Sequence, residues 1–133
     1  IEETTFGALS KMYKNMLVED RNAIAREYYG LSREYVENFT QCASVARNIS
    51  AHGARLYNRV KMRPSVDLPK RLKSVIDNDK PAAYLYAIFA LLPDSEKYPM
   101  LTQIARAFRK YPFAKPQYLG LPENWFSLFE SIQ

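Results

Sequence analysis

The sequence has few of the residues that build metal sites, disulfides and phosphate-binding loops. It holds one Cys, one His, one Trp and 4 Gly in 133 residues. The lone Cys42 cannot form an intramolecular disulfide, and one Cys with one His is too small a set for a zinc site. Neither a glycine-rich phosphate loop nor a nucleophile-elbow motif occurs. We therefore expect no metal and no cofactor, and a single thiol suits a reducing, cytoplasmic location.

Long apolar runs and alternating patterns are also missing. The longest apolar run, residues 81–93, is too short to span a bilayer. No segment alternates apolar and polar residues over the length of a strand, and no internal repeat is apparent. Apolar residues make up 47% of the chain and charged residues 25%, the balance of an ordinary globular protein. These features predict an all-α fold that makes no use of a membrane.

Apolar residues recur instead at three- and four-residue spacing, which is typical of amphipathic helices. The pattern predicts helices that begin at Thr4 or Thr5, at Asp20 and after Ser32, the third running unbroken toward Pro64. Further helices are predicted over residues 70–76, 81–92 and 96–110, with Pro99 in the first turn of the last one. A short segment with Trp125, Leu128 and Phe129 is expected to seal one end of the bundle.

We expect these helices to form one all-α domain. Residues 1–62 would supply the helices that carry the motif discussed below, and residues 63–133 a C-terminal helical extension. Because the chain begins with Ile1 and not with Met, it is expected to be the C-terminal part of a longer protein.

Basic charge is concentrated in one stretch of the sequence. Between Arg55 and Lys73 there are seven basic residues and one acid, Asp67, so this stretch carries 7 − 1 = +6, against +5 for the whole chain. Such a local positive field attracts polyanions such as RNA through the release of counterions. The alternative is a solvated basic face that only keeps an inert helical scaffold soluble.

The single histidine lies in the most informative stretch, RNISAHGARLYNR at residues 47–59. An imidazole has an ordinary pKa of about 6.5, so near neutral pH it accepts or donates protons. RNA carries its own nucleophile, the 2′-hydroxyl, and its cleavage needs proton transfer and a fixed positive charge but no metal. His52 fits the proton transfer and Arg47 the stabilisation of phosphate charge. Asn48 lies one turn before His52 and is a candidate to orient the imidazole or the substrate.

This spacing alone does not establish catalysis, because a lone histidine on a helix is more often structural or solvated. On an ideal helix Arg47 and His52 also lie about 140° apart, so the arginine must curl round the helix or the helix must deform. One histidine would further have to act as acid and as base. A two-fold homodimer would solve this by bringing two copies of His52 to one composite site.

Several neighbours of the motif are candidates for RNA binding, namely Arg55, Tyr57, Arg59, Lys61 and Arg63. Tyr57 would stack on an unpaired base and the basic residues would contact phosphates. Arg55 and Arg59 fit equally well as salt-bridge partners of Glu37 or of acids on a neighbouring helix. Other aromatic residues at helical spacing are weaker stacking candidates because such residues are more often core; these are Tyr13, Tyr28, Tyr29, Tyr35 and Phe108. Cys42 falls on an apolar stripe and is expected to be buried and inert.

Three motifs occur in a specific order along the chain: TFGALSKMY at residues 5–13, RNISAHGARLYNR at 47–59 and LGLPENW at 119–125. They resemble the FG-x-L-S-x-x-Y, RN-x-x-AH-x-x-RLWNR and G-x-P-x-x-W stretches of Abi-like proteins of the AbiD/AbiF type. The chain departs from that pattern at three positions: Ser50 stands where cysteine is common, Gly53 where a second histidine is common, and Tyr57 in place of tryptophan.

The resemblance places the chain with the HEPN superfamily, whose helical members include many metal-independent ribonucleases. It implies an HEPN-like helical bundle and a homodimeric endoribonuclease toxin of bacterial abortive infection, a form of antiviral defence. Arg47 and His52 would be the catalytic pair and Asn48 the usual polar second residue of the motif. RNA would be the substrate, and a regulatory N-terminal region or an antitoxin a further partner. The alternative is a non-catalytic HEPN module that binds RNA or a partner protein, with His52 in a structural role.

Overall fold

The computed structural model describes residues 15, 18–29, 31–51 and 61–132, and the structural statements below concern these residues. Their elements are α2 (Val18–Ile24), the π-helical turn η1 (Ala25–Tyr29), α3 (Arg33–Ala51), α4 (Lys70–Lys73), α5 (Pro81–Leu91), α6 (Asp94–Lys110), the 3-10 turn η2 (Pro116–Leu119) and α7 (Trp125–Glu130). None of the described residues forms a strand. The prediction of an all-α fold is confirmed.

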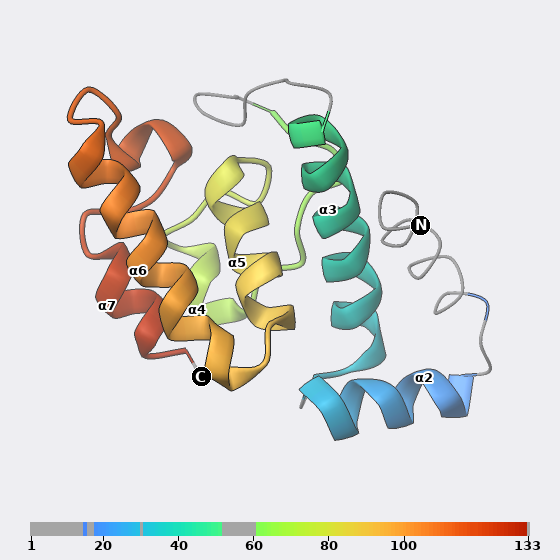
Figure 1. Ribbon diagram of the computed structural model, residues 1–133. Helices are drawn as coiled ribbons and strands as arrows, with labels where there is room; N and C mark the ends of the chain where they lie inside the picture. Colours follow the sequence, from blue (N-terminus) through green and yellow to red (C-terminus); the bar gives the residue numbers. More distant parts are fainter. Residues whose placement is uncertain (1–14, 16–17, 30, 52–60, 133) are drawn as a thin grey trace.

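Helices α3, α5 and α6 form the body of the molecule and alternate in direction (Figure 1). α5 lies between the other two, α2 crosses near the beginning of α3, and α7 lies alongside α6. Because the directions alternate, α3 and α6 both finish at the end of the bundle where α5 begins. We call this the motif end, because the last turns of α3 carry Arg47 and Asn48 there.

Packing between α3 and α5 holds the two parts of the sequence together. The buried residues of α3 recur at helical spacing and are each at most 3% exposed: Val36, Phe39, Cys42, Ala43 and Ala46. α5 is apolar along its whole length and has no charged residue. Its alanines at positions 82, 83 and 87 are fully buried, and such small side chains allow a close approach of the two helices.

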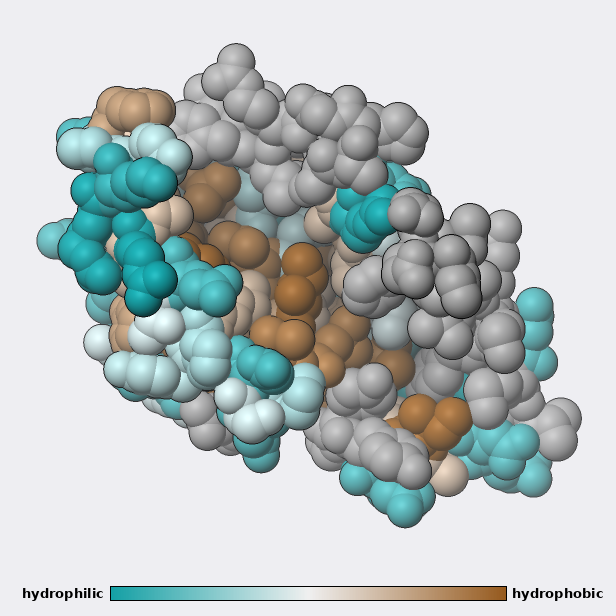
Figure 2. Space-filling view, viewed as in Figure 1, coloured by the Kyte–Doolittle hydropathy of each residue, from teal (hydrophilic) through white to brown (hydrophobic). Residues whose placement is uncertain are grey.

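Part of the α5 surface stays open to solvent. Its half-buried side chains pack at the edge of the main core; they include Leu85, Ile88 and Leu91. Figure 2 shows apolar side chains gathered in the middle of this face, in a hollow beside the hydrophilic surface of α6. Among the described helices, none is long and apolar enough to cross a membrane.

Aromatic rings join α7 to the core. The Phe129 ring lies 5.3 Å from Phe89, 6.1 Å from Tyr86 and 6.5 Å from Trp125, centroid to centroid. Trp125 in turn lies 6.0 Å from Phe108 on α6. The C-terminal segment is helical and buries Trp125 and Phe129 as predicted, but it lies beside α6 and does not seal an end of the bundle (Figure 1).

Three details of the predicted helices are wrong. The helix predicted over residues 70–76 is shorter, because α4 ends at Lys73 and residues 74–76 form no helix. Residues 61–69 form no helix, so the third helix does not run to Pro64. Pro99 is not in the first turn of its helix, because α6 already begins at Asp94 and places this proline in its sixth position. The helix predicted from Thr4 or Thr5 lies outside the described residues. The second predicted helix is present as α2, and it continues into the π-helical turn η1, which the apolar spacing did not indicate.

Candidate functional site at the end of helix α3

Arg47 and Asn48 occupy the last turns of α3. At 100° per residue, Asn48 points almost opposite to the buried stripe centred on Phe39 and Ala46, whereas Arg47 lies at its edge. The burial agrees, because Asn48 is exposed and Arg47 is half-buried. Asn48 therefore lies on the solvent side of α3, and Arg47 has the core on one side.

The central residue of the motif, His52, follows directly after the described part of α3. His52, Arg55, Tyr57 and Arg59 lie outside the described residues. Their roles, and the pairing of Arg47 with His52, therefore stay predictions. Tyr13 also lies outside them.

The chain after the motif is an extended segment, residues 61–69, that packs against the core. Burial alternates along it: Met62, Val66 and Leu68 are buried. Between them, Lys61 and Arg63 are exposed. Backbone hydrogen bonds fix the segment, since the Met62 N–H donates to the Asp79 carbonyl at 2.7 Å and the Val66 N–H to the Asn78 carbonyl at 2.8 Å. Both predicted RNA-binding residues that the structure describes are thus turned toward solvent.

Side chains from α3 and α5 fasten the same segment. The Asn38 amide donates to the Ser65 carbonyl at 3.0 Å and accepts from the Asp67 N–H at 2.8 Å. From α5, the Tyr84 hydroxyl donates to the Pro64 carbonyl, and the Arg63–Pro64 peptide bond is cis. The two stretches that flank residues 52–60, the end of α3 and residues 61–69, are therefore both attached to the same core.

Cys42 lies beneath this attachment and is not a nucleophile. Its Sγ is 3.9 Å from the Pro64 carbonyl oxygen and 3.9 Å from Asn38 Oδ1, and the residue is 0% exposed. Burial raises the pKa of the thiol to about 12, so it stays protonated at neutral pH. Burial likewise raises the pKa of the Tyr84 hydroxyl above its ordinary value. The predicted burial of the cysteine is confirmed.

The basic stretch meets a group of acidic residues in the fold. Its described basic residues, Lys61, Arg63, Lys70, Arg71 and Lys73, are all exposed. A pocket of about 860 Å³ lies beside them and is lined by Glu34, Asp67, Asp77 and Asp79 together with Lys73. The sequence count of +6 included only Asp67 among these acids. The positive field is therefore interrupted on this side of the molecule.

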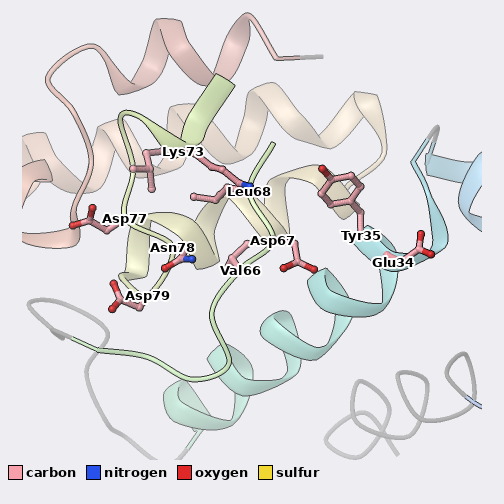
Figure 3. Close-up of a pocket in the computed structure, with 10 residues that line it drawn as sticks. Glu34, Tyr35, Val66, Asp67, Leu68, Lys73, Asp77, Asn78 and Asp79 are labelled. Carbon is pink, nitrogen blue, oxygen red and sulfur yellow. The ribbon is translucent and has the colours of Figure 1, made fainter. Parts of the chain in front are cut away.

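The acids of this pocket do not converge on one point. Figure 3 shows Glu34 and Tyr35 of α3 on one side and Asp77, Asn78 and Asp79 of the loop before α5 on the other. In the described parts of the chain, no three His, Cys, Asp or Glu residues are placed to hold a metal ion. The pocket thus offers spread negative charge and no metal centre.

Ion pairs distinguish Arg47 from two other arginines near α3. Glu37 contacts Arg21 at 2.9 Å and Arg33 at 4.0 Å, so the acid considered as a partner of Arg55 or Arg59 already has two basic neighbours. No ion pair between described residues includes Arg47. Its guanidinium is not committed to a salt bridge within this part of the chain.

Two of the predicted stacking residues are partly packed in the structure. Tyr35 lies 5.7 Å from Phe39, and Phe108 lies 6.0 Å from Trp125, centroid to centroid, and both are half-buried. Sequence reasoning missed three exposed aromatic residues that follow α6, namely Tyr111, Phe113 and Tyr118. A signal was present, because residues 97–122 contain five basic residues and no acid.

Comparison with known proteins agrees with the motifs of the N-terminal part. Residues 1–58, less than half of the 133-residue chain, match the family model described as Abi-like protein. The matched range includes α2, α3 and both the 5–13 motif and Arg47 to His52. Neither a curated protein nor a solved structure matches the chain. The family match supports the Abi-like family as the relatives of this chain.

Proposed function

We propose that the chain is a metal-independent endoribonuclease of the HEPN type that acts in bacterial abortive infection. The observation that carries the proposal is the placement of Arg47 and Asn48 on the last turns of α3, within the range that matches Abi-like proteins. The face of that helix opposite Asn48, with Arg47 at its edge, packs against α5 through buried residues such as Phe39 and Ala46. A helix that is packed against a core holds side chains such as those of Arg47 and Asn48 in place, which favours catalysis.

The proposed reaction uses the 2′-hydroxyl of RNA as the nucleophile. A base removes its proton, the oxygen attacks the adjacent phosphorus, and the P–O5′ bond breaks as an acid protonates the leaving 5′-oxygen. The products are a 2′,3′-cyclic phosphate and a 5′-hydroxyl. His52 would transfer protons, and Arg47 would stabilise the charge on the phosphorane through its planar fork. Asn48, which is exposed, would orient the imidazole or the substrate.

Homodimerisation completes the proposal. Acid and base are two roles, and the chain has one histidine. A two-fold interface at the motif end would bring two copies of His52 and of Arg47 to one site. Sedimentation at micromolar concentration is expected to show a dimer. A purely monomeric chain with full activity would contradict this step.

The test compares His52→Ala and Arg47→Ala with the unchanged chain on a labelled single-stranded RNA. Loss of general acid–base catalysis is expected to slow cleavage by about 10² to 10⁴ for His52→Ala. EDTA is expected to have no effect, and the products should carry cyclic phosphate ends. Gln41→Ala is the matched control, because Gln41 is an exposed residue of α3 outside the motif.

Two outcomes would reject the nuclease. Cleavage that persists undiminished in His52→Ala would show that the histidine is not catalytic, and inhibition by EDTA would show that a metal is needed. Salt-dependent RNA binding without any cleavage would favour the alternative, a non-catalytic HEPN module. In that module the exposed Lys61 and Arg63 would contact phosphates.

A further inference from the structure

Three aromatic residues are exposed in the segment that follows α6. Phe113 is 74% exposed, Tyr111 46% and Tyr118 45%. The other large apolar side chains exposed in the described residues are scattered: Val18, Val75 and Tyr98. Large exposed rings gathered within eight residues of sequence indicate an interaction surface. We call residues 109–118 the aromatic–basic loop.

Positive charge surrounds these rings. Residues 97–122 contain no acid, and four of their basic residues are exposed near the end of α6 or in the loop: Arg106, Arg109, Lys110 and Lys115. Lys110 Nζ lies over the Tyr111 ring, 5.6 Å from its centroid. The Tyr111 and Phe113 rings lie 6.0 Å apart at an angle of 66°. Planar rings and cations therefore occur together on one short segment.

Backbone hydrogen bonds and prolines hold the loop in shape. The Ala114 N–H donates to the Tyr111 carbonyl at 2.9 Å and the Leu121 N–H to the Pro116 carbonyl at 3.1 Å. Gly120 closes the η2 turn with φ of 89°, a left-handed conformation. A surface that is already ordered loses less conformational entropy when it binds a ligand. More of the free energy of its contacts therefore contributes to affinity.

The chemistry of the loop fits a single-stranded nucleic acid. Unpaired bases stack on aromatic rings whatever their sequence, while cations beside the rings neutralise the phosphates. Residues 97–122 contain no acid that would repel a polyanion, and the carboxylate that lies beside the loop is Glu123, which lines a pocket with Lys115. Duplex RNA offers no free base faces and would use the charges alone.

The position of the loop adds a second argument. α6 finishes at the motif end of the bundle, where α3 carries Arg47 and Asn48 (Figure 1). A strand held by the loop would thus be bound at the same end of the molecule as the motif. The acidic pocket beside the extended segment 61–69 offers no comparable surface, because four carboxylates line it.

We propose that the aromatic–basic loop is a docking site for single-stranded RNA, with Phe113 and Tyr111 stacking on bases and Lys110 and Lys115 contacting phosphates. The choice of RNA as the strand rests on the proposed function. Base stacking and phosphate contact rest on the loop itself.

The test measures binding of the full chain to a fluorescein-labelled 2′-O-methyl oligouridine by anisotropy. This probe lacks the 2′-hydroxyl nucleophile, so binding is measured whether or not the chain cleaves RNA. Phe113→Ala is expected to weaken binding about tenfold, as the loss of one base stack does. Lys110→Gln is expected to lower the slope of log K against log[salt] by about 0.7. Because Phe113 is 74% exposed, its replacement should leave the fold intact, which a thermal melt checks.

Tyr98→Ala is the matched control. Tyr98 is an aromatic residue of α6 that is 56% exposed but lies near the other end of that helix, where its ring contacts Phe126 at 6.0 Å. Unchanged binding in Tyr98→Ala together with weakened binding in Phe113→Ala supports the proposal. Equal binding by Phe113→Ala and the unchanged chain overturns it. Binding to anionic phospholipid vesicles in preference to the oligonucleotide also overturns it and assigns the loop to a membrane surface.

Discussion

Asn38 of α3 accepts a hydrogen bond from the backbone N–H of Asp67, 29 residues further along the chain, at 2.8 Å. The same amide donates to the Ser65 carbonyl at 3.0 Å. One side chain thus satisfies two backbone groups of a segment without regular secondary structure. This contact attaches the extended segment 61–69 to α3, alongside the hydrogen bonds that the segment makes with Asn78, Asp79 and Tyr84.

Asn38→Ala is therefore expected to lower the free energy of unfolding by about 1–2 kcal/mol, because two backbone groups lose their partner. Urea denaturation followed by circular dichroism measures the change. Gln41→Ala, an exposed residue of the same helix, serves as control and is expected to change stability by less than about 0.5 kcal/mol. Equal stability of the two variants would show that water replaces the Asn38 amide at no cost.

The burial of Cys42 predicts a pH-dependent stability. Burial raises the pKa of the folded thiol from 9.0 to about 12, while the unfolded thiol keeps its ordinary value. The stabilising contribution of the neutral thiol is thus complete below about pH 9 and is lost as the pH rises toward 12. Between about pH 8 and about pH 10, the unchanged chain should lose more unfolding free energy than Cys42→Ala does.

The comparison with Cys42→Ala separates the thiol from Tyr86, whereas Tyr84 interacts with Cys42 and its titration changes with the substitution. Burial raises the pKa of Tyr86 to about 12 as well, and both chains share this group. As a second measurement, iodoacetamide at neutral pH should leave the folded chain unmodified and alkylate it in denaturant. Rapid alkylation of the folded chain would contradict the buried position of the thiol.

Gly120 predicts a cost for any added side chain. Its φ is 89°, and a Cβ there would lie 3.1 Å from Cβ and 3.1 Å from Cδ of Lys80. Gly120→Ala is expected to destabilise the fold by about 1–2 kcal/mol, because a left-handed conformation is strained for alanine. Gln117→Ala in the same turn replaces an exposed side chain and should be neutral in the same thermal melt. A neutral Gly120→Ala would show that the turn relaxes to another conformation.

Substitutions of Phe129 test how strongly α7 is packed against the core. Its ring is 1% exposed and contacts Phe89, Tyr86 and Trp125. Phe129→Ala leaves a cavity and is expected to cost about 3–5 kcal/mol, whereas Phe129→Leu should cost clearly less. Calorimetry of the two variants measures which of them loses more unfolding free energy. A small effect of the alanine variant would mean that α7 contributes little to the core.

The helices that the sequence predicted best are those decided by local pattern. Pro81 and Pro93 bracket the apolar run of α5, and periodic apolar residues mark α6 from Met100 to Phe108. The extended segment 61–69 was not predicted, because its conformation depends on Asn38 and Tyr84, which are distant in sequence. Long-range hydrogen bonds produce no periodic pattern of residues in the sequence from which they could be predicted.

The candidate site could be predicted only where its residues are close together in the sequence. Arg47 and Asn48 stand together on α3 because they are neighbours in sequence. The acidic pocket was not predictable, since Glu34, Asp67 and Asp77 come from three separate segments. The aromatic–basic loop was overlooked for another reason: aromatic residues near helices are usually core, and only burial distinguishes Phe113 from Phe108.

Arg47→Lys is the sharpest test of the role given to the guanidinium. The substitution keeps one positive charge and a long side chain at the edge of the buried face of α3, so the fold should be preserved. It removes the planar fork that matches two phosphate oxygens at once. If Arg47 stabilises the phosphorane, cleavage should fall by about tenfold or more while binding of the uncleavable 2′-O-methyl probe changes little.

Arg26→Lys is the control for this substitution, because Arg26 is an exposed arginine of η1 outside the motif. Single-turnover cleavage and probe binding are measured for both variants. A charge that only attracts RNA would let lysine replace arginine with no loss of rate, and Arg47→Lys would then behave as Arg26→Lys does. A loss confined to Arg47→Lys and to the cleavage step would instead mean that geometry, and not charge alone, is required at position 47. The attachment of α3 to α5 would supply that geometry.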